Sequence, residues 1–254
     1  YINKWPHIKW MLTVMNHGTA SIFTALRNNT DGAKDTFLTE LVRIMEKYPW
    51  CAGVDIDLER GGEYENRTAA NALFRDIYNT VKAYDSTKLV NICMPGMTSV
   101  NGSVGGENWC VYADLDAYCD SVSIMSYGMA WAGSAPGPVS PRDWLEGIYD
   151  YASSVMDPQK IFMGLPGYGW NWQIYDTPEN LGKTYRGTSN TYYAAKLWMT
   201  GGYNFTDDAP PQPMIPIFSF LSIFILLILK YSFINLFILF ITVTTQAKLT
   251  RISA

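Results

Sequence analysis

Three carboxylates stand at every second position of one short apolar stretch, at Asp55, Asp57 and Glu59. Side chains alternate between the two faces of a β-strand, so a strand here would place all three acids on one face. Neighbouring carboxylates in a partly buried site raise the pKa of at least one of them. One carboxyl group can then stay protonated near neutral pH, as a general acid requires. The spacing therefore predicts acid–base chemistry at the end of a strand.

An acidic edge strand or a calcium site would also bring Asp and Glu together. A calcium loop of the EF-hand type needs D-x-[DN]-x-[DN]-G and a Glu at its twelfth position, whereas here Gly53 precedes the acids and no such loop follows. The two histidines are too few for most zinc sites, and the four cysteines form no C-x-x-C pair. We therefore expect no metal and no cofactor, and a disulfide between Cys110 and Cys119 stays open.

The acids must be positioned by the elements around them. Apolar, partly β-branched runs predict buried strands at 9–14, 51–59, 89–94, 121–127 and 160–165. Helical periodicity and capping residues predict helices at 36–48, 66–84 and 109–119 and one that begins near 140. We expect Asp35 or Thr36 as the N-cap of the first of these helices and Ser140 as the N-cap of the last. Alternating strands and helices of this spacing are typical of α/β proteins with a parallel sheet.

The absence of a G-x-G-x-x-G turn argues against a doubly wound dinucleotide-binding sheet. We therefore expect a (β/α)8 TIM barrel, in which the working residues lie at the C-terminal ends of the strands. Glu59 and Tyr127 are the last residues of predicted strands, and the segment 167–172 follows another. The fold would bring them to one end of the barrel.

Composition narrows the class of partner. A formal charge of −4 and the lack of Lys/Arg blocks argue against nucleic acid. Nine Trp and seventeen Tyr in 254 residues suit stacking against sugars, and they suit a large core equally well.

The composition changes near residue 213. Every Gly, Trp, Asp and Glu lies at or before Asp208, whereas residues 214–246 are almost wholly apolar, with Lys230 as the only charge. We divide the chain into a barrel at 1–213 and an aberrant apolar tail at 214–254. A run of this length can span a membrane, and translation of A/T-rich DNA in a lost reading frame would have the same composition. Both interpretations stay open, and a membrane is expected as a partner only through residues 214–243.

Three segments resemble one enzyme family. The stretch 53–59 is similar to the D-G-x-D-x-D-x-E signature of glycoside hydrolase family 18, with Ala52 in place of the first Asp. The stretch 123–127 resembles the family's M-x-Y-D strand end, with Gly128 in place of its Asp, and 163–170 resembles its G-L-P-x-Y-G strand. The three matches follow the family's order.

The resemblance implies hydrolysis of glycans of β-1,4-linked N-acetylglucosamine by a substrate-assisted retaining mechanism, which uses no enzyme nucleophile. It implies that Glu59 is the general acid and that Asp57 orients the substrate's acetamido group. It further implies that Asp55 shares a proton with Asp57 and that Tyr127 hydrogen-bonds the acetamido group. The implied substrate-binding residues are Met125, Tyr168, Trp131, Trp170 and Trp172. For each Trp, core packing is the alternative.

The choice of glycan within the family rests on one further resemblance. Residues 135–141 are similar to the branch of the family that cuts bacterial cell-wall glycan, such as spore-cortex hydrolases and phage or prophage lysins. This places peptidoglycan slightly ahead of chitin and implies an extracellular or cell-wall location.

Two departures and the strand count limit the resemblance. Ala52 and Gly128 remove two family acids, so we expect reduced activity, and a lectin-like glycan-binding protein on the same fold is the second hypothesis. A membrane protein that works through its tail is the third. The strands at 51–59 and 160–165 resemble the family's fourth and seventh, so we expect a barrel incomplete at both ends.

Overall fold

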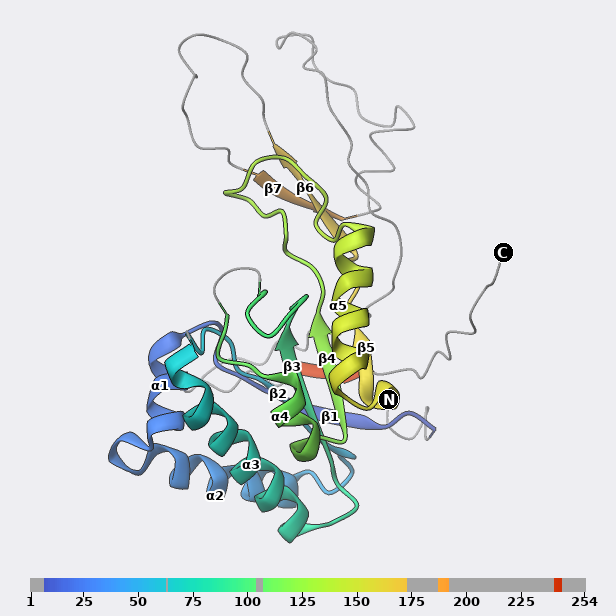
Figure 1. Ribbon diagram of the computed structural model, residues 1–254. Helices are drawn as coiled ribbons and strands as arrows, with labels where there is room; N and C mark the ends of the chain where they lie inside the picture. Colours follow the sequence, from blue (N-terminus) through green and yellow to red (C-terminus); the bar gives the residue numbers. More distant parts are fainter. Residues whose placement is uncertain (1–6, 63, 104–106, 173–186, 192–239, 244–254) are drawn as a thin grey trace, which may run out of the picture.

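The computed structural model describes residues 7–62, 64–103, 107–172, 187–191 and 240–243. Its centre is a six-stranded sheet in the order β5-β4-β3-β2-β1-β8 (Figure 1). The strands are β1 (Trp10–Met15), β2 (Gly53–Asp57), β3 (Leu89–Pro95), β4 (Ser121–Met125), β5 (Ile161–Met163) and β8 (Phe240–Val243).

Strands β1 to β5 are parallel and stand side by side in chain order. The strands of a (β/α)8 barrel follow one another in this way, whereas in a doubly wound sheet the order of the strands reverses at a switch point. Strand β8 pairs antiparallel with β1. Within the described residues the sheet stays open, so an α/β fold with an unclosed barrel is confirmed.

Helices connect the parallel strands (Figure 1). They are α1 (Ala20–Asn28), α2 (Ala33–Lys47), α3 (Arg67–Tyr84), α4 (Tyr112–Leu115) and α5 (Arg142–Val155). The longest, α3, buries the apolar stripe that its sequence predicts, including Leu73, Ile77 and Val81.

Strand β2 separates its apolar side chains from its acids. Val54, Ile56 and Leu58 are at most 2 % exposed and belong to the hydrophobic core with α3. By alternation, Asp55 and Asp57 take the opposite face. The apolar layer between strand and helix therefore fixes the direction in which the acids project.

Three helices differ from expectation. Helix α1 was not expected. Only two of its nine residues, Phe23 and Leu26, are buried, so its apolar face is narrow. Helix α2 begins at Ala33, with Gly32 instead of Asp35 or Thr36 at its N-cap. The helix expected at 109–119 shrinks to α4 and a 3-10 turn at Asp116–Tyr118.

The start of α5 also differs from expectation, and the structure answers the question that the sequence left open for two cysteines. Pro141, rather than Ser140, is the N-cap of α5, because the Ser140 hydroxyl donates to Ser126 O at 2.6 Å. Cys110 and Cys119 are buried free thiols, so the disulfide that the sequence left open is not formed. Burial raises the pKa of the Cys119 thiol to about 12.

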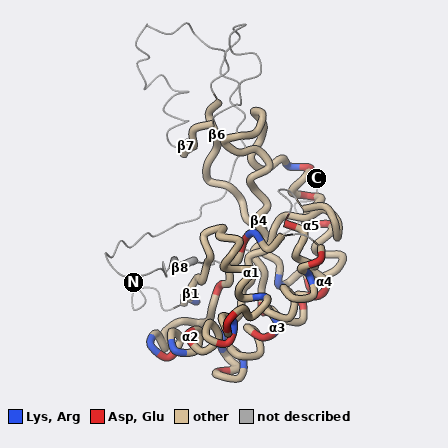
Figure 2. The backbone as a smooth tube through the Cα atoms, turned by 90° about the vertical axis from the view of Figure 1, so that its left-hand side faces the viewer, with Lys and Arg blue, Asp and Glu red and all other residues tan. Residues whose placement is uncertain are grey.

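A two-stranded hairpin of β6 (Tyr168–Trp172) and β7 (Gly187–Thr191) extends beyond the sheet (Figure 1). Figure 2 shows Lys, Arg, Asp and Glu interspersed along α2 and α3, whereas the hairpin strands carry none of them. The hairpin strands thus carry no charge, and they lie at the opposite end of the molecule from the charged helices α2 and α3 (Figures 1 and 2).

The apolar tail falls mostly outside the described residues. Of its length, only β8 is described, so the two interpretations of residues 214–239 and 244–254 concern sequence that lies beyond the structure's described ranges. In the described part of the chain, no helix has the length and apolar character needed to cross a membrane.

Candidate active site

Asp55 is the buried centre of a polar row that crosses the sheet. It is 5 % exposed and pairs in register with Thr13 on β1 and Asn91 on β3. Thr13 Oγ1 donates to Asp55 Oδ2 at 2.8 Å, and Asn91 Nδ2 donates to Oδ1 at 2.6 Å. The carboxylate is therefore held by strands on both sides.

The row continues onto β4. Asn91 Nδ2 also donates to Ser123 Oγ at 3.0 Å, and Ser121 Oγ donates to Asn91 Oδ1 at 2.8 Å. Cys93 adds a thiol that donates to Asp55 Oδ1 at 3.4 Å. Buried polar groups of this kind are costly unless they are bonded. The row supplies those bonds and orders Asp55.

Asp57 is the last residue of β2, two positions after Asp55. Burial, and then the charges of Glu59 and Asp55, raise the pKa of Asp57 to about 7. Its Oδ1 atom is buried and accepts no hydrogen bond from the described residues. Asp57, the middle one of the three acids, therefore has a raised pKa and a buried oxygen that can accept a hydrogen bond.

Tyr127 follows β4 and approaches Asp57. Burial is the main cause of the raised pKa of the Tyr127 phenol, and the nearby Cys93 and Asp57 raise it further. A Cβ at Gly164 would be 2.8 Å from Tyr127 Cε1, so the ring packs on bare backbone. Tyr168 meets the same ring edge-on, with 6.4 Å between centroids. Asp57, Tyr127 and Tyr168 therefore form one cluster.

Glu59 lies two residues beyond β2 and is half-buried. Its backbone N–H and C=O both bond the side chain of Asn16. Two residues later, the Gly61 N–H donates to Glu107 Oε2 at 3.0 Å, and the Gly61 C=O accepts from Arg27 at 2.5 Å. Burial is the main cause of the raised pKa of Glu107. The segment that carries Glu59 is thus fixed from two other loops.

The predicted aromatic residues divide into two groups. Trp170 meets Tyr168 edge-on at 6.1 Å between centroids and so extends the Tyr127 cluster. Trp131 is 57 % exposed, and Trp172 Nε1 donates to its carbonyl at 3.3 Å. Trp131 and Trp172 thus form a separate pair, where the 127–140 loop meets the hairpin.

Met125, the remaining predicted substrate contact, is half-buried at the end of β4, opposite Pro95 of β3. It lies two residues before Tyr127.

The two departures from the family motif occupy different settings. Ala52 precedes β2, where its N–H donates to Trp10 O at 2.7 Å and its C=O accepts from Leu89 at 2.8 Å. By alternation its side chain lies on the Val54 face, away from the face that carries Asp55. Gly128 has φ +87°, with no neighbour within 4 Å of a Cβ there, so an acid would have room and a strained backbone.

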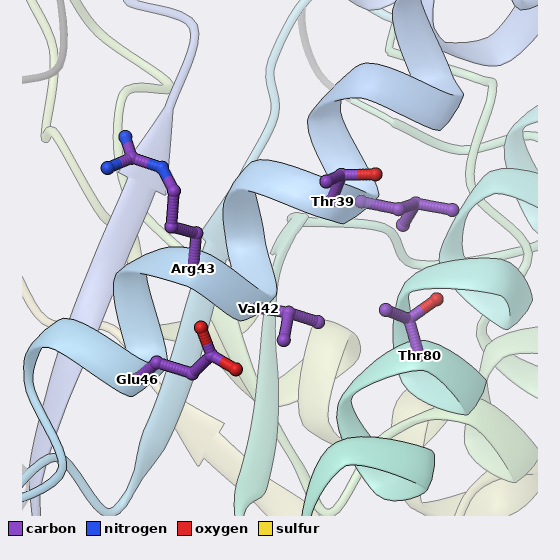
Figure 3. A pocket seen from close by; sticks show the side chains of 6 residues that line it. Thr39, Val42, Arg43, Glu46 and Thr80 are labelled. Atoms are coloured by element: carbon purple, nitrogen blue, oxygen red, sulfur yellow. The ribbon is translucent and has the colours of Figure 1, made fainter.

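Two surface grooves lie away from the carboxylates. One runs between α2 and α3 (Figure 3) and is lined by Leu38, Thr39, Val42, Arg43, Glu46 and Thr80. The other is lined by Thr68, Asn71, Ala72, Arg75, Asp114 and Tyr118. Neither includes a predicted site residue. Among the described side chains, no group of three or more His, Cys, Asp or Glu is arranged to hold a metal ion.

Four residues around the acids were missed by sequence reasoning: Thr13, Asn16, Asn91 and Glu107. Thr13 and Asn91 interrupt apolar strands, and a single polar residue on the carboxylate face of a buried strand is a usable signal. Asn16 and Glu107 lie in loops. Nothing in their local sequence indicates which backbone they bond.

The sequence of this chain is similar to one enzyme family and to individual bacterial proteins. The family model described as Glycosyl hydrolases family 18 matches residues 2–208. The cortical fragment-lytic enzyme of Bacillus anthracis is 27 % identical over 178 residues, which is 70 % of this chain and 40 % of that protein. The uncharacterized glycosylase YvbX of Bacillus subtilis is 26 % identical over 150 residues, which is 57 % of this chain and 41 % of that protein.

Solved structures share the fold. The spore cortex-lytic enzyme SleL of Bacillus cereus aligns with TM-score 0.64 and 24 % identity, over 77 % of this chain and 43 % of its own. A chitinase from Chromobacterium violaceum aligns with TM-score 0.64 and 21 % identity, over 74 % of this chain and 56 % of its own. In both curated relatives and in SleL, the match spans less than half of the relative's length.

Proposed function

Because the chain belongs to glycosyl hydrolase family 18, we propose that it hydrolyses glycans of β-1,4-linked N-acetylglucosamine by a substrate-assisted mechanism. The carrying observation is Asp57, which combines a pKa raised to about 7 with a buried Oδ1 that accepts no hydrogen bond from the described residues. A buried oxygen of this kind is suited to an N–H donor from the substrate. The acetamido group of N-acetylglucosamine carries such a donor.

In the first step, Glu59 donates its proton to the glycosidic oxygen as the bond from that oxygen to the anomeric carbon breaks. The substrate's acetamido oxygen attacks the anomeric carbon and forms a cyclic oxazolinium ion. Asp57 accepts the acetamido N–H, and its negative charge stabilises the positive ring. The neighbouring phenol of Tyr127 donates a hydrogen bond to the acetamido oxygen.

In the second step, ionised Glu59 takes a proton from a water molecule, which attacks the anomeric carbon and opens the oxazolinium ring. Two inversions retain the anomeric configuration, and Glu59 regains its proton. Asp55 acts through Asp57, because its charge helps to raise the pKa of Asp57. The bonds from Thr13 and Asn91 keep Asp55 in place.

For the substrate, we propose peptidoglycan slightly ahead of chitin. The names of the cortical fragment-lytic enzyme and of the spore cortex-lytic enzyme support cell-wall glycan, and the chitinase among the structural neighbours supports chitin. The place of action proposed is the cell wall or the extracellular space. Tyr168, Trp170 and the exposed Trp131 are the proposed sugar-binding surfaces.

The deciding experiment incubates the protein with chitooligosaccharides and with peptidoglycan and measures new reducing ends. The Glu59→Gln variant should lose hydrolysis by at least ~100-fold, because the amide keeps the shape and has no acidic proton to transfer. Its glycan affinity, measured by calorimetry, should stay within a few-fold of the parent. If the variant cuts at the parent's rate, Glu59 is not the acid and the mechanism is wrong.

A glycan-binding protein without catalysis is the second candidate, and it is favoured by Ala52 and Gly128, which stand where the family has acids. The same experiment separates the two functions. A lectin would bind the oligosaccharides with equal affinity in the parent and in Glu59→Gln, and it would release no reducing ends from either.

A further inference from the structure

Asn16 stands at the C-terminal end of β1 and is 3 % exposed. Its Nδ2 donates to Glu59 O at 2.8 Å and to Thr19 O at 3.1 Å. Its Oδ1 accepts from Glu59 N at 3.0 Å and from Gly18 N at 3.3 Å. An Asn side chain has two N–H donors and two acceptor lone pairs, so the amide is fully used.

The Asn16 amide continues the hydrogen bonding beyond the end of the backbone ladder between β1 and β2. The last register pair between β1 and β2 joins Met15 to Asp57. Beyond it, His17 and Gly18 have φ of 50° and 66°, and the left-handed backbone turns the chain away from β2. The Asn16 side chain then offers Glu59 one donor and one acceptor, as the backbone of a neighbouring strand would.

This arrangement bears on the proposed acid. Gly18, bonded by the same amide, also lies against the Glu59 carboxyl group, since a Cβ at Gly18 would be 3.4 Å from Glu59 Oε2. One buried amide therefore orders both the backbone of Glu59 and a backbone surface that its carboxyl group faces. Misplacement of a reacting group by about 1 Å can cost roughly 100-fold in rate.

We infer that Asn16 is a positioning residue for Glu59, which extends the β1–β2 ladder to the acid through its side-chain amide. The inference rests on the proposed function for its catalytic consequence. It makes Glu59 depend on a residue 43 positions earlier in the chain. Asn16 itself touches neither substrate nor reacting atoms.

The test compares three variants with the parent. Asn16→Ala removes all four bonds, and Asn16→Asp keeps the acceptor, loses both donors and adds a charge beside Glu59. Asn29→Ala is the matched control: Asn29 also bonds the backbone of a later segment, accepting from Lys34 N in the first turn of α2 at 2.9 Å, and it lies at the other end of α1. Each variant is first checked for cooperative unfolding in urea.

On a glycan that the parent cuts, kcat should fall roughly 10- to 100-fold in both Asn16 variants, while KM stays within about threefold. In Asn16→Asp the added charge should also move the pH profile of kcat to higher pH. Asn29→Ala should lose stability and keep its kcat. Equal kcat losses in Asn16→Ala and Asn29→Ala would reduce Asn16 to a structural residue and overturn the inference.

A readout without turnover separates this inference from the proposed function. Hydrogen exchange of the Glu59 amide, followed by NMR, should be slow in the parent and at least ~10-fold faster in Asn16→Ala, while the amides of β3 keep their protection. If the parent cuts no glycan, the proposed function fails and the exchange still decides whether Asn16 holds Glu59. Unchanged exchange at Glu59 overturns the inference in either case.

Discussion

Asp57 couples the chemistry of the site to the stability of the fold. Its folded-state pKa of about 7 lies above the ordinary 3.8, so between these two values the folded protein binds more protons than the unfolded chain. The contribution of Asp57 to the free energy of unfolding must then fall as pH rises from about 4 to about 7. Ionisation of Asp57, the proposed substrate-orienting acid, thus destabilises the folded state.

Asp57→Asn should remove this dependence, because the amide stays neutral. The variant should gain on the order of a few kcal/mol over the parent at pH 8 relative to pH 4, while hydrolysis is lost. Urea denaturation across pH 4 to 8 measures the difference. Asp150→Asn, an exposed acid on α5, is the control and should follow the parent. A stability difference between Asp57→Asn and the parent that is the same at pH 4 and at pH 8 would contradict the prediction.

At the scale of elements, Gly53 allows β2 to approach β3. A Cβ at this position would lie 1.9 Å from Leu89 O and 2.5 Å from Leu89 N. Both are backbone atoms, so the overlap can be relieved only by separating the two strands. The residue that opens the carboxylate strand is therefore constrained by packing, before any question of catalysis.

Gly53→Ala should lower the free energy of unfolding by about 3 kcal/mol, the upper end for overpacking in a tight core. Gly169→Ala on β6 is the matched control, because no atom lies within 4 Å of its added methyl group. We expect that variant to stay within about 0.5 kcal/mol of the parent in urea denaturation. Equal midpoints for both variants would show that β2 and β3 can part without cost.

The strands and the long helices could be predicted because each carries its own period. Alternation in the stretch 53–59 identifies β2, and the apolar stripe of α3 identifies that helix. The expected helix at 109–119 was too long. Trp109, Tyr112 and Leu115 have helical spacing, yet Trp109 stacks on Phe74 at 5.3 Å between centroids, before α4 begins.

The site was predictable where its residues lie on one element. Asp55, Asp57 and Glu59 follow from a single strand. Their partners come from three other segments, and only the tertiary fold brings Asn16 or Glu107 to the backbone after β2. A sequence without aligned relatives contains no signal for such contacts between loops.

At the scale of the whole molecule, the open sheet and the apolar tail set the solution behaviour. Residues 214–246 hold a single charge, Lys230, and a long apolar segment favours association unless another surface covers it. Strand edges that lack a partner add to this tendency. Removal of the tail would also remove β8 and its four-residue pairing with β1.

We therefore expect residues 1–213 to be more soluble than the full chain in detergent-free buffer. Size-exclusion chromatography with light scattering compares the two, and thermal unfolding reports whether each melts cooperatively. A monomeric full chain that melts in one cooperative transition would mean that the tail packs as an ordinary part of the core, and the prediction would be wrong.

Strand β1 is flanked by partners that are very unequally distant along the chain. Leu12 pairs with Val54 on one side and with Ile241 on the other. The entropic cost of closing a loop rises by only about 0.6 kcal/mol with each doubling of its length, but contacts between distant segments slow folding. During synthesis, β1 and β2 can pair long before residue 241 leaves the ribosome. We therefore expect the parallel strands to pair early on the folding pathway and the β1–β8 edge to form last.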